Sequence, residues 1–326
     1  MKGIQVLDRP ASQSFYAVAG RLLFIQSFDR HLAALIQRFF AGWQLTPVSS
    51  PERDPDVQIL FLRGEQLPEI HSAPSLSQFD VANDGRCYTT ADQFFLQFSH
   101  SSVRLEPGNP LRVSVSVSGP TDAELARVTS FAVCAALRRF GVFELHSAGV
   151  VLPQSNNAVL IVGPSGSGKS SLTLQLARTG WAYLSDDELL LNVVDEKVEA
   201  RGFRSFFALA PAAAATAGGP SRLKTCFEPS SVFATPPMTQ AVPRFIFFTS
   251  VSGASETRLC ELDQTETMTR LLRACPWATY DTAVAGPHVQ LLSRLARQAR
   301  GFELQAGTEI LEPAQASRII LAACQV

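Results

Sequence analysis

Residues 163–170 read Gly-Pro-Ser-Gly-Ser-Gly-Lys-Ser and fit the pattern G-x-x-x-x-G-K-[ST], which limits this chain to few folds. The five residues before it, 158–162, are apolar and predict a buried strand. Residues 171–178 have a helical pattern that ends before Gly180. In such a strand–turn–helix unit, glycines let backbone N–H groups turn inward, and the helix N-terminus attracts negative charge. The segment therefore predicts a phosphate-binding loop.

Each residue type in this loop has a predicted task. Lys169 would reach the β- and γ-phosphates of a nucleotide, and Ser170 would ligate Mg²⁺. The competing interpretation is a Gly/Ser-rich turn that matches by accident, but the flanking strand and helix favour nucleotide binding. The residues expected to hold the nucleotide are Gly163, Pro164, Ser165, Gly166, Ser167, Gly168, Lys169, Ser170 and Ser171.

Composition excludes several classes of protein. The apolar share of 46%, with 17% charged residues, is typical of a packed core. A net charge of −1 without a basic stripe gives no reason to expect nucleic acid or an anionic membrane as a partner. The 6 cysteines are scattered without a C-x-x-C pair, which indicates reduced thiols. Because the first ten residues also lack the apolar region of a signal peptide, we expect a cytoplasmic protein.

A length of 326 residues favours two domains. Residues 1–120 read as a smaller α+β domain without recognisable chemistry. Gly119 and Pro120 end its last strand, and residues 121–124 form a capping box that opens an apolar helix. We therefore predict a boundary near residue 120, with an α/β domain over residues 121–326.

Two acidic residues follow the loop at a suggestive distance. Asp186 and Asp187 come 17 and 18 residues after Lys169, at the end of the next predicted strand. Two acids there could have separate roles, one holding Mg²⁺ and the other accepting a hydroxyl proton. A solvated Asp-Asp turn is the alternative. His146 precedes the loop by the length of a hairpin, and a lone histidine between apolar residues is more often structural.

Taken together, these segments resemble a known family. A His-Ser strand at 146–147, the loop at 163–170 and the Leu-Ser-Asp-Asp segment at 184–187 closely resemble the catalytic domain of HPr kinase/phosphorylase. The resemblance is strong over residues 144–195 and weak over the rest of the C-terminal part. It implies a phosphate-loop kinase fold related to phosphoenolpyruvate carboxykinase, whose sheet is mixed rather than parallel.

The resemblance also implies roles for single residues. Residues 163–170 would hold ATP, and Ser170 with Asp187 would hold Mg²⁺. Asp186 matches the acid/base aspartate that deprotonates an attacking serine hydroxyl, and His146 matches the histidine that assists it. With Lys169, these residues make the expected catalytic set.

Two departures from the family point to a different acceptor. The E-I-R-G-x-G signature that contacts HPr and supports the reverse reaction is missing, and residues 203–219 are rich in Ala and Pro instead. Residues 1–120 do not resemble the family's regulatory domain. We therefore expect a divergent kinase that phosphorylates Ser or Thr of a peptide or protein, such as a ribosomally made peptide. Its acceptor would dock at 203–219, flanked by Arg201, Arg204 and Arg222. These three and Lys224 are nearby cations that could neutralise the transferring phosphate, and ordinary surface charge is their alternative role.

Other functions stay open at this level. A transport ATPase of the ABC type would need an L-S-G-G-Q-like segment, which the chain lacks. A small-molecule kinase on the same fold, or an ATP-binding sensor or scaffold without catalysis, fits the same motifs. The sequence does not decide the oligomeric state, and a homo-oligomer is compatible with it.

Overall fold

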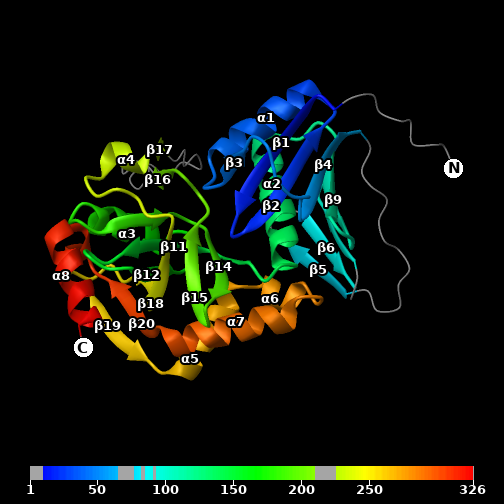
Figure 1. The fold of residues 1–326 in the computed structure, drawn as a ribbon. Helices are drawn as coiled ribbons and strands as arrows, with labels where there is room; N and C mark the ends of the chain where they lie inside the picture. The colour runs from blue at the N-terminus through cyan, green and yellow to red at the C-terminus, as the bar shows by residue number, and fades with distance from the viewer. Residues whose placement is uncertain (1–9, 65–76, 82–84, 91–92, 210–224, 326) are drawn as a thin grey trace. The chain divides into compact units, whose positions relative to one another are not determined.

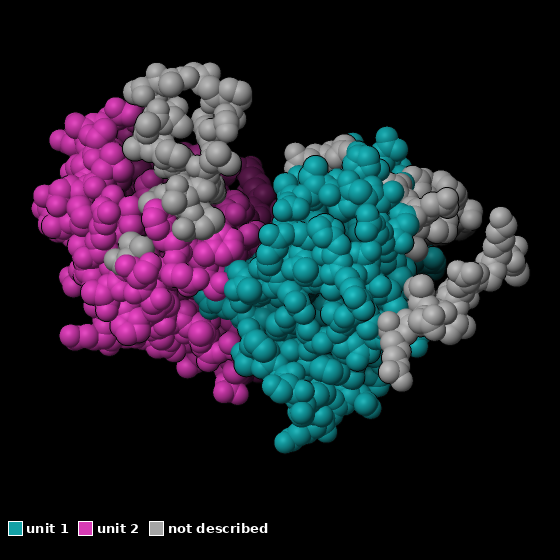
Figure 2. Space-filling model, turned by 90° about the horizontal axis from the view of Figure 1, so that it is seen from above, with its two compact units in different colours: residues 1–142, 277–288 teal, residues 143–276, 289–326 magenta. Residues whose placement is uncertain are grey.

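The computed structural model describes residues 10–64, 77–81, 85–90, 93–209 and 225–325. The chain divides into two units, residues 1–142 with 277–288 and residues 143–276 with 289–326 (Figure 2). This division differs from the boundary predicted near residue 120. The reason is that helix α2 (Asp122–Arg138) packs on strands β4, β8 and β9 of the first unit. The segment 277–288 returns to that unit from far along the sequence.

The first unit is built on one mixed sheet. Its strands are β1 (Ser12–Val18), β2 (Arg21–Ser27), β3 (Thr46–Val48), β4 (Val57–Arg63), β5 (Ser77–Val81), β6 (Gly85–Thr89), β7 (Phe94–Gln97), β8 (Ser101–Glu106) and β9 (Leu111–Val117). The order is β3-β1-β2-β4-β9-β8-β7-β6-β5, in which β4 runs parallel to β2 and β9. The helices that belong to it are α1 (Arg30–Ala41), α2 and α6 (Trp277–Tyr280).

Local signals in the sequence explain both long helices of this unit. Asp29 caps α1 by accepting a hydrogen bond from the backbone N–H of Leu32. The Thr121 hydroxyl likewise accepts from the Glu124 N–H and opens α2. The Glu124 carboxylate, however, accepts from Ser101 of β8, so only half of the predicted capping box forms.

The second unit carries the phosphate-loop segment (Figure 1). Its elements are β10 (Phe143–Leu145), β11 (Ser147–Val151), β12 (Asn157–Val162), α3 (Lys169–Ala177), β13 (Ala182–Ser185), β14 (Leu189–Val194), β15 (Lys197–Gly202), β16 (Phe207–Leu209), β17 (Thr225–Phe227), α4 (Pro229–Val232), β18 (Gln240–Val251), β19 (Arg258–Leu262), α5 (Gln264–Ala274), most of α7 (Ala285–Gln298), β20 (Arg300–Ala306), η2 (Thr308–Leu311) and α8 (Pro313–Cys324).

The sheet of this unit is mixed, as the sequence analysis expected. Strands β12, β18 and β20 run parallel side by side, whereas β11 is antiparallel to both β12 and β13. The long strand β18 also pairs with β15, which continues the sheet through β14 to β10. Since parallel strands end at the same edge of a sheet, the segments after β12, β18 and β20 meet there.

The core on one face of this sheet fixes the helix that follows the loop. Leu172 and Leu176 of α3 are buried with Val159 and Ile161, the alternate residues of β12. Helix α8 contributes to the same core, and its Ser317 hydroxyl receives a hydrogen bond from Trp181 Nε1 at 3.0 Å. Helix α3 is thereby held with its N-terminus at the end of β12. Among the described residues, no helix combines the length and apolarity needed to cross a membrane.

Candidate phosphate-binding and catalytic site

Glycines give the loop between β12 and α3 its path. Gly166 and Gly168 have φ angles of +84° and +93°, a region that L side chains rarely adopt. Gly163 is required for a different reason, since a Cβ there would lie 2.5 Å from Ser167 Oγ and 2.8 Å from the carbonyl oxygen of Thr249. Helix α3 begins directly after Gly168, so its first N–H groups border the loop.

The loop is anchored on the end of β18. Ser167 Oγ lies 3.1 Å from Thr249 Oγ1, and that hydroxyl contacts the carbonyl oxygen of Val162 at 3.4 Å. The Ser167 N–H also donates to the carbonyl of Pro164. Ser167 and Thr249 are both buried, so these bonds form away from water. The sequence analysis missed Thr249, because it lies 82 residues from its partner.

Lys169 points back over the loop. Its Nζ donates to the carbonyl oxygens of Gly163 and Pro164 at 2.7 and 3.1 Å. It also lies 3.2 Å from His146 Nε2. Because an ammonium group can only donate, Nε2 is the acceptor, and the neutral imidazole carries its proton on Nδ1. The structure thus brings together two of the three predicted catalytic side chains.

Ser170 and Asp186 form the second contact at this site. Ser170 Oγ donates to Asp186 Oδ1 at 2.8 Å, and Asp186 is 2% exposed. The sequence analysis expected Ser170 to share a metal ion with Asp187 instead. Hydroxyl and carboxylate oxygens are ligands that Mg²⁺ accepts, together with phosphate and water oxygens. No group of three or more His, Cys, Asp or Glu side chains is placed for a metal within the part of the chain described here.

Asp187 faces the histidine rather than the serine. Its Oδ1 lies 3.4 Å from His146 Nδ1, and both side chains are partly exposed. The backbone of Asp187 has a φ of +75°. A non-glycine residue in this region is uncommon, and such residues gather at functional sites. Four of the five expected residues therefore pair as Ser170–Asp186 and His146–Asp187, while the role of each aspartate stays a prediction.

Hydrogen bonds from neighbouring segments hold the aspartate turn. Ser185 Oγ donates to the carbonyl of Glu188 at 2.7 Å, and the Arg204 N–H contacts Ser185 Oγ at 3.3 Å. Arg204 also forms an ion pair with Glu188 at 3.3 Å. Burial raises the pKa of Tyr183, which precedes this turn in β13, and the charge of Asp186 also raises it. The turn is thus fixed on both sides.

The structure describes two of the four expected cations. Arg201 donates to Gln240, and Arg204 is paired with Glu188 as described. Arg222 and Lys224, with residues 210–219 of the predicted docking loop, lie outside the described residues. The role of these cations stays a prediction.

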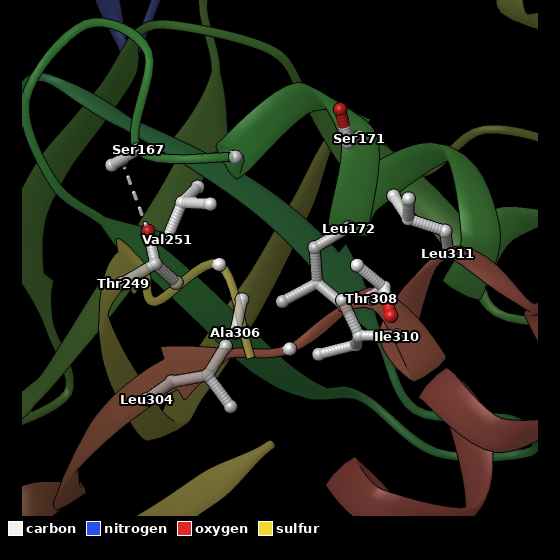
Figure 3. A pocket seen from close by; sticks show the side chains of 13 residues that line it. Ser167, Ser171, Leu172, Thr249, Val251, Leu304, Ala306, Thr308, Ile310 and Leu311 are labelled. Atoms are coloured by element: carbon white, nitrogen blue, oxygen red, sulfur yellow. Dashed lines mark hydrogen bonds between the residues drawn. The ribbon is translucent and has the colours of Figure 1, made fainter. Parts of the chain in front are cut away.

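Two cavities border the loop. The first, here called the Leu304 cavity, has a volume of about 120 Å³ and a mostly apolar lining from α3, β18, β20 and η2 (Figure 3). Ser171, Leu172, Val251, Leu304 and Ile310 are among its lining residues. It lies at the carboxyl ends of β18 and β20, beside the start of α3.

The second, here called the Arg270 cavity, has a volume of about 460 Å³. It is lined by His146, Gly163 and Pro164 of the loop region and by residues of β18, α5 and β20. Arg270, Arg273 and Glu303 give it charge. The sequence analysis missed these three. Arg270 follows Glu266 by four residues, a spacing typical of an ordinary ion pair on a helix surface.

Comparisons with known proteins give limited information. No family model matches the chain, and no curated protein matches it. Among solved structures, the HPr(Ser) kinase/phosphatase from Coxiella burnetii is similar over 56% of this chain and 97% of its own. The two are 12% identical, with a TM-score of 0.29. The residues of the site therefore carry the functional conclusion.

Proposed function

We propose that the second unit binds ATP with Mg²⁺ and transfers the γ-phosphate to a Ser or Thr hydroxyl of a peptide or protein. The observation that carries this proposal is the convergence of Lys169, Ser170, Asp186, Asp187 and His146 on one glycine-rich loop. These residues supply the parts that phosphoryl transfer needs, which are positioning, neutralisation of charge and a base for the acceptor hydroxyl.

The nucleotide would lie along the start of α3. Its phosphates would meet the loop N–H groups and Lys169 Nζ, which would exchange a loop carbonyl for a phosphate oxygen. The nucleoside would then extend past Ser171 into the Leu304 cavity, whose apolar lining suits a flat base. The carboxyl ends of parallel strands are the usual place for such a ligand.

Ser170 and Asp186 are the residues that would hold Mg²⁺. Their oxygens already lie 2.8 Å apart, and hydroxyl and carboxylate oxygens are ligands that Mg²⁺ accepts. Bound there with the nucleotide, the ion would neutralise charge on the β- and γ-phosphate oxygens.

Asp187 and His146 are the pair that would receive the acceptor. The hydroxyl oxygen of the acceptor would attack the γ-phosphorus while the bond to the bridging oxygen of ADP breaks. The hydroxyl proton would pass to Asp187, whose carboxylate is 37% exposed and therefore accessible to a substrate. His146, held by Lys169, would orient that carboxylate through Nδ1–H. This assignment exchanges the two aspartate roles that the family resemblance implied.

Substitution of each aspartate by asparagine tests the proposal. Asn tolerates a positive φ, so Asp187→Asn keeps the backbone compatible. We expect it to lower phosphate transfer from labelled ATP by about 10²–10⁴-fold while the Kd for ATP·Mg²⁺ is unchanged. Asp186→Asn should weaken Mg²⁺-dependent ATP binding itself. Asp195→Asn, at another turn residue with positive φ, is the matched control and should change neither.

The opposite pattern, with Asp187→Asn weakening Mg²⁺-dependent binding, would return the roles to those implied by the family. If the unsubstituted protein bound ATP·Mg²⁺ but transferred phosphate to no peptide or small alcohol, the chain would be an ATP-binding sensor. Transfer only to a small alcohol would make it a small-molecule kinase.

A further inference from the structure

The Arg270 cavity has a chemical character that phosphate binding alone does not explain. His146, Gly163 and Pro164 line it, so it opens onto the residues assigned to the acceptor side of the loop. Its remaining lining comes mostly from the end of β18 and from α5, and includes the apolar side chain of Phe248. At about 460 Å³ it has room for a side chain or a small organic acid.

Two arginines line this cavity. Arg270 and Arg273 are three residues apart on α5, so both project from one face of the helix. Arg270 is held by two carboxylates, Glu266 and Glu303, each at 2.8 Å. Arg273 is exposed and forms no ion pair with any residue that the structure describes. Glu303 therefore neutralises one arginine of the cavity and leaves the other available.

Arg270 is fixed in place before any ligand arrives. Its guanidinium bridges α5 and β20 through Glu303, and its hydrogen bond to that carboxyl group lowers the pKa of Glu303. Glu303 is held in turn by Gln305 Nε2 at 3.2 Å. A guanidinium positioned in this way presents a rigid set of donors, which suits a carboxylate or phosphate.

An exposed arginine on an amphipathic helix is usually solvated and has no further role. Three observations separate Arg273 from that case. It lines a cavity with an apolar part, the cavity also contains the fixed Arg270, and its lining includes His146 of the proposed catalytic pair. A ligand held by Arg273 would thus lie beside the residues that handle the acceptor hydroxyl.

We propose that the Arg270 cavity binds an anionic group of the phosphate acceptor, a carboxylate or a phosphate joined to the hydroxyl that is phosphorylated. The proposal rests on the proposed kinase function and specifies its substrate class. Arg273 is the residue that determines this specificity, with Arg270 as its fixed neighbour. For the proposed peptide acceptor, this group is a carboxylate of an acidic residue near the Ser or Thr. A small hydroxy acid shares this chemistry, and its use would change the acceptor class but not the anion site.

Paired acceptors that differ in one charge test the inference. The pairs are a Gly-Ser-Asp-Gly peptide with its Gly-Ser-Asn-Gly counterpart, glycerate with glycerol, and glycerol phosphate with glycerol. With labelled ATP and Mg²⁺, we expect kcat/KM for the acidic member of at least one pair to be about 10- to 100-fold higher. Arg273→Gln should remove this preference, and Arg273→Glu should reverse it. Arg258→Gln, an exposed arginine of β19 outside the cavity, should keep it.

The pair that shows the preference identifies the source of the anion. Equal kcat/KM within every pair, the absence of transfer to every acidic member, or a preference that survives in Arg273→Gln would overturn the inference. So would a fall in kcat that is equal for acidic and neutral acceptors, because that result places Arg273 on the transferring phosphate. Calorimetry of ATP·Mg²⁺ with the unsubstituted protein separates the two proposals. If ATP does not bind, the kinase function fails; if ATP binds and neutral acceptors react equally well, only the anion site fails.

Discussion

The ion pair between Arg138 and Asp281 predicts how the segment 277–288 is held in the first unit. Both side chains are 0% exposed, and Arg138 Nε lies 3.0 Å from Asp281 Oδ2. Arg139 donates to the same oxygen at 2.8 Å, and the Arg138 guanidinium lies 4.4 Å from the ring centre of Trp277. One carboxylate thus balances two arginines, one of which is inaccessible to water.

Asp281→Asn keeps the size of the side chain but removes its charge. Arg138 then stays buried without a counter-charge, and removing one partner of such a pair costs about 3–5 kcal/mol. We expect the free energy of unfolding of the first unit to fall by that amount. Urea titration followed by tryptophan fluorescence measures the loss, since Trp43 and Trp277 both belong to this unit.

Two further variants make the result specific. In Arg138→Met with Asp281→Leu, both charges of the fully buried pair are absent, so most of the loss should be recovered. Glu106→Gln breaks the exposed pair with Arg104 and should cost at most about 1 kcal/mol. If Asp281→Asn lost no more than Glu106→Gln, the buried pair would not fasten this segment and the reasoning would be wrong.

Two other variants test the loop and the first unit. Gly163→Ala places a Cβ 2.8 Å from the Thr249 carbonyl oxygen, so we expect calorimetry to show ATP·Mg²⁺ binding about 5- to 100-fold weaker. Gly286→Ala, whose Cβ would meet open space at a residue without a positive φ, should keep the Kd, and equal Kd values in both variants would refute the steric argument. Burial, followed by the charge of Arg138, lowers the pKa of His288 from 6.5 to about 4, so the unfolded state takes up a proton at a higher pH than the folded state. Stability present above pH 6.5 is therefore lost as the pH falls toward about 4, and the loss in the free energy of unfolding is about 2 kcal/mol at about pH 5. In urea titrations, His288→Leu should make the free energy of unfolding less dependent on pH. The same pH dependence in His288→Leu and the unsubstituted protein would contradict this prediction.

Local signals in the sequence predicted the phosphate loop well. The run 158–162 lies within β12, and the predicted helix begins at Lys169, because apolar periodicity and glycine positions act over a few residues. The cap at Thr121 was predicted for the same reason.

Contacts between residues far apart in the sequence were not predicted, and they determine the division into two units. The boundary was placed near residue 120 because Gly119 and Pro120 end a strand there, yet α2 packs back on the sheet that precedes it. Residues 277–288 carry no local mark of belonging to the first unit. Their place depends on contacts such as that between Asp281 and Arg138, which are 143 residues apart.

The sequence likewise predicted only part of the candidate site. Ser170, Asp186 and Asp187 were found from motif spacing and His146 from the family resemblance, but neither could tell which aspartate faces the serine. That distinction comes from contacts in the fold, in which Asp186 accepts from Ser170 and Asp187 lies beside His146. Arg273 lines the Arg270 cavity because of the way α5 packs, and no short sequence motif predicts that packing.

Calorimetric titration of ATP·Mg²⁺ into the protein and its Lys169→Ala variant tests the central claim most directly. Lys169 Nζ is the cation held over the loop, at hydrogen-bonding distance from Gly163 and Pro164. Its loss should weaken nucleotide binding by about 10- to 100-fold, the effect of removing a charge-assisted hydrogen bond. Lys197→Ala, at an exposed lysine of β15, should bind as the unsubstituted protein does. Equal affinity in Lys169→Ala and the unsubstituted protein would contradict the assignment of this loop to the phosphates of ATP.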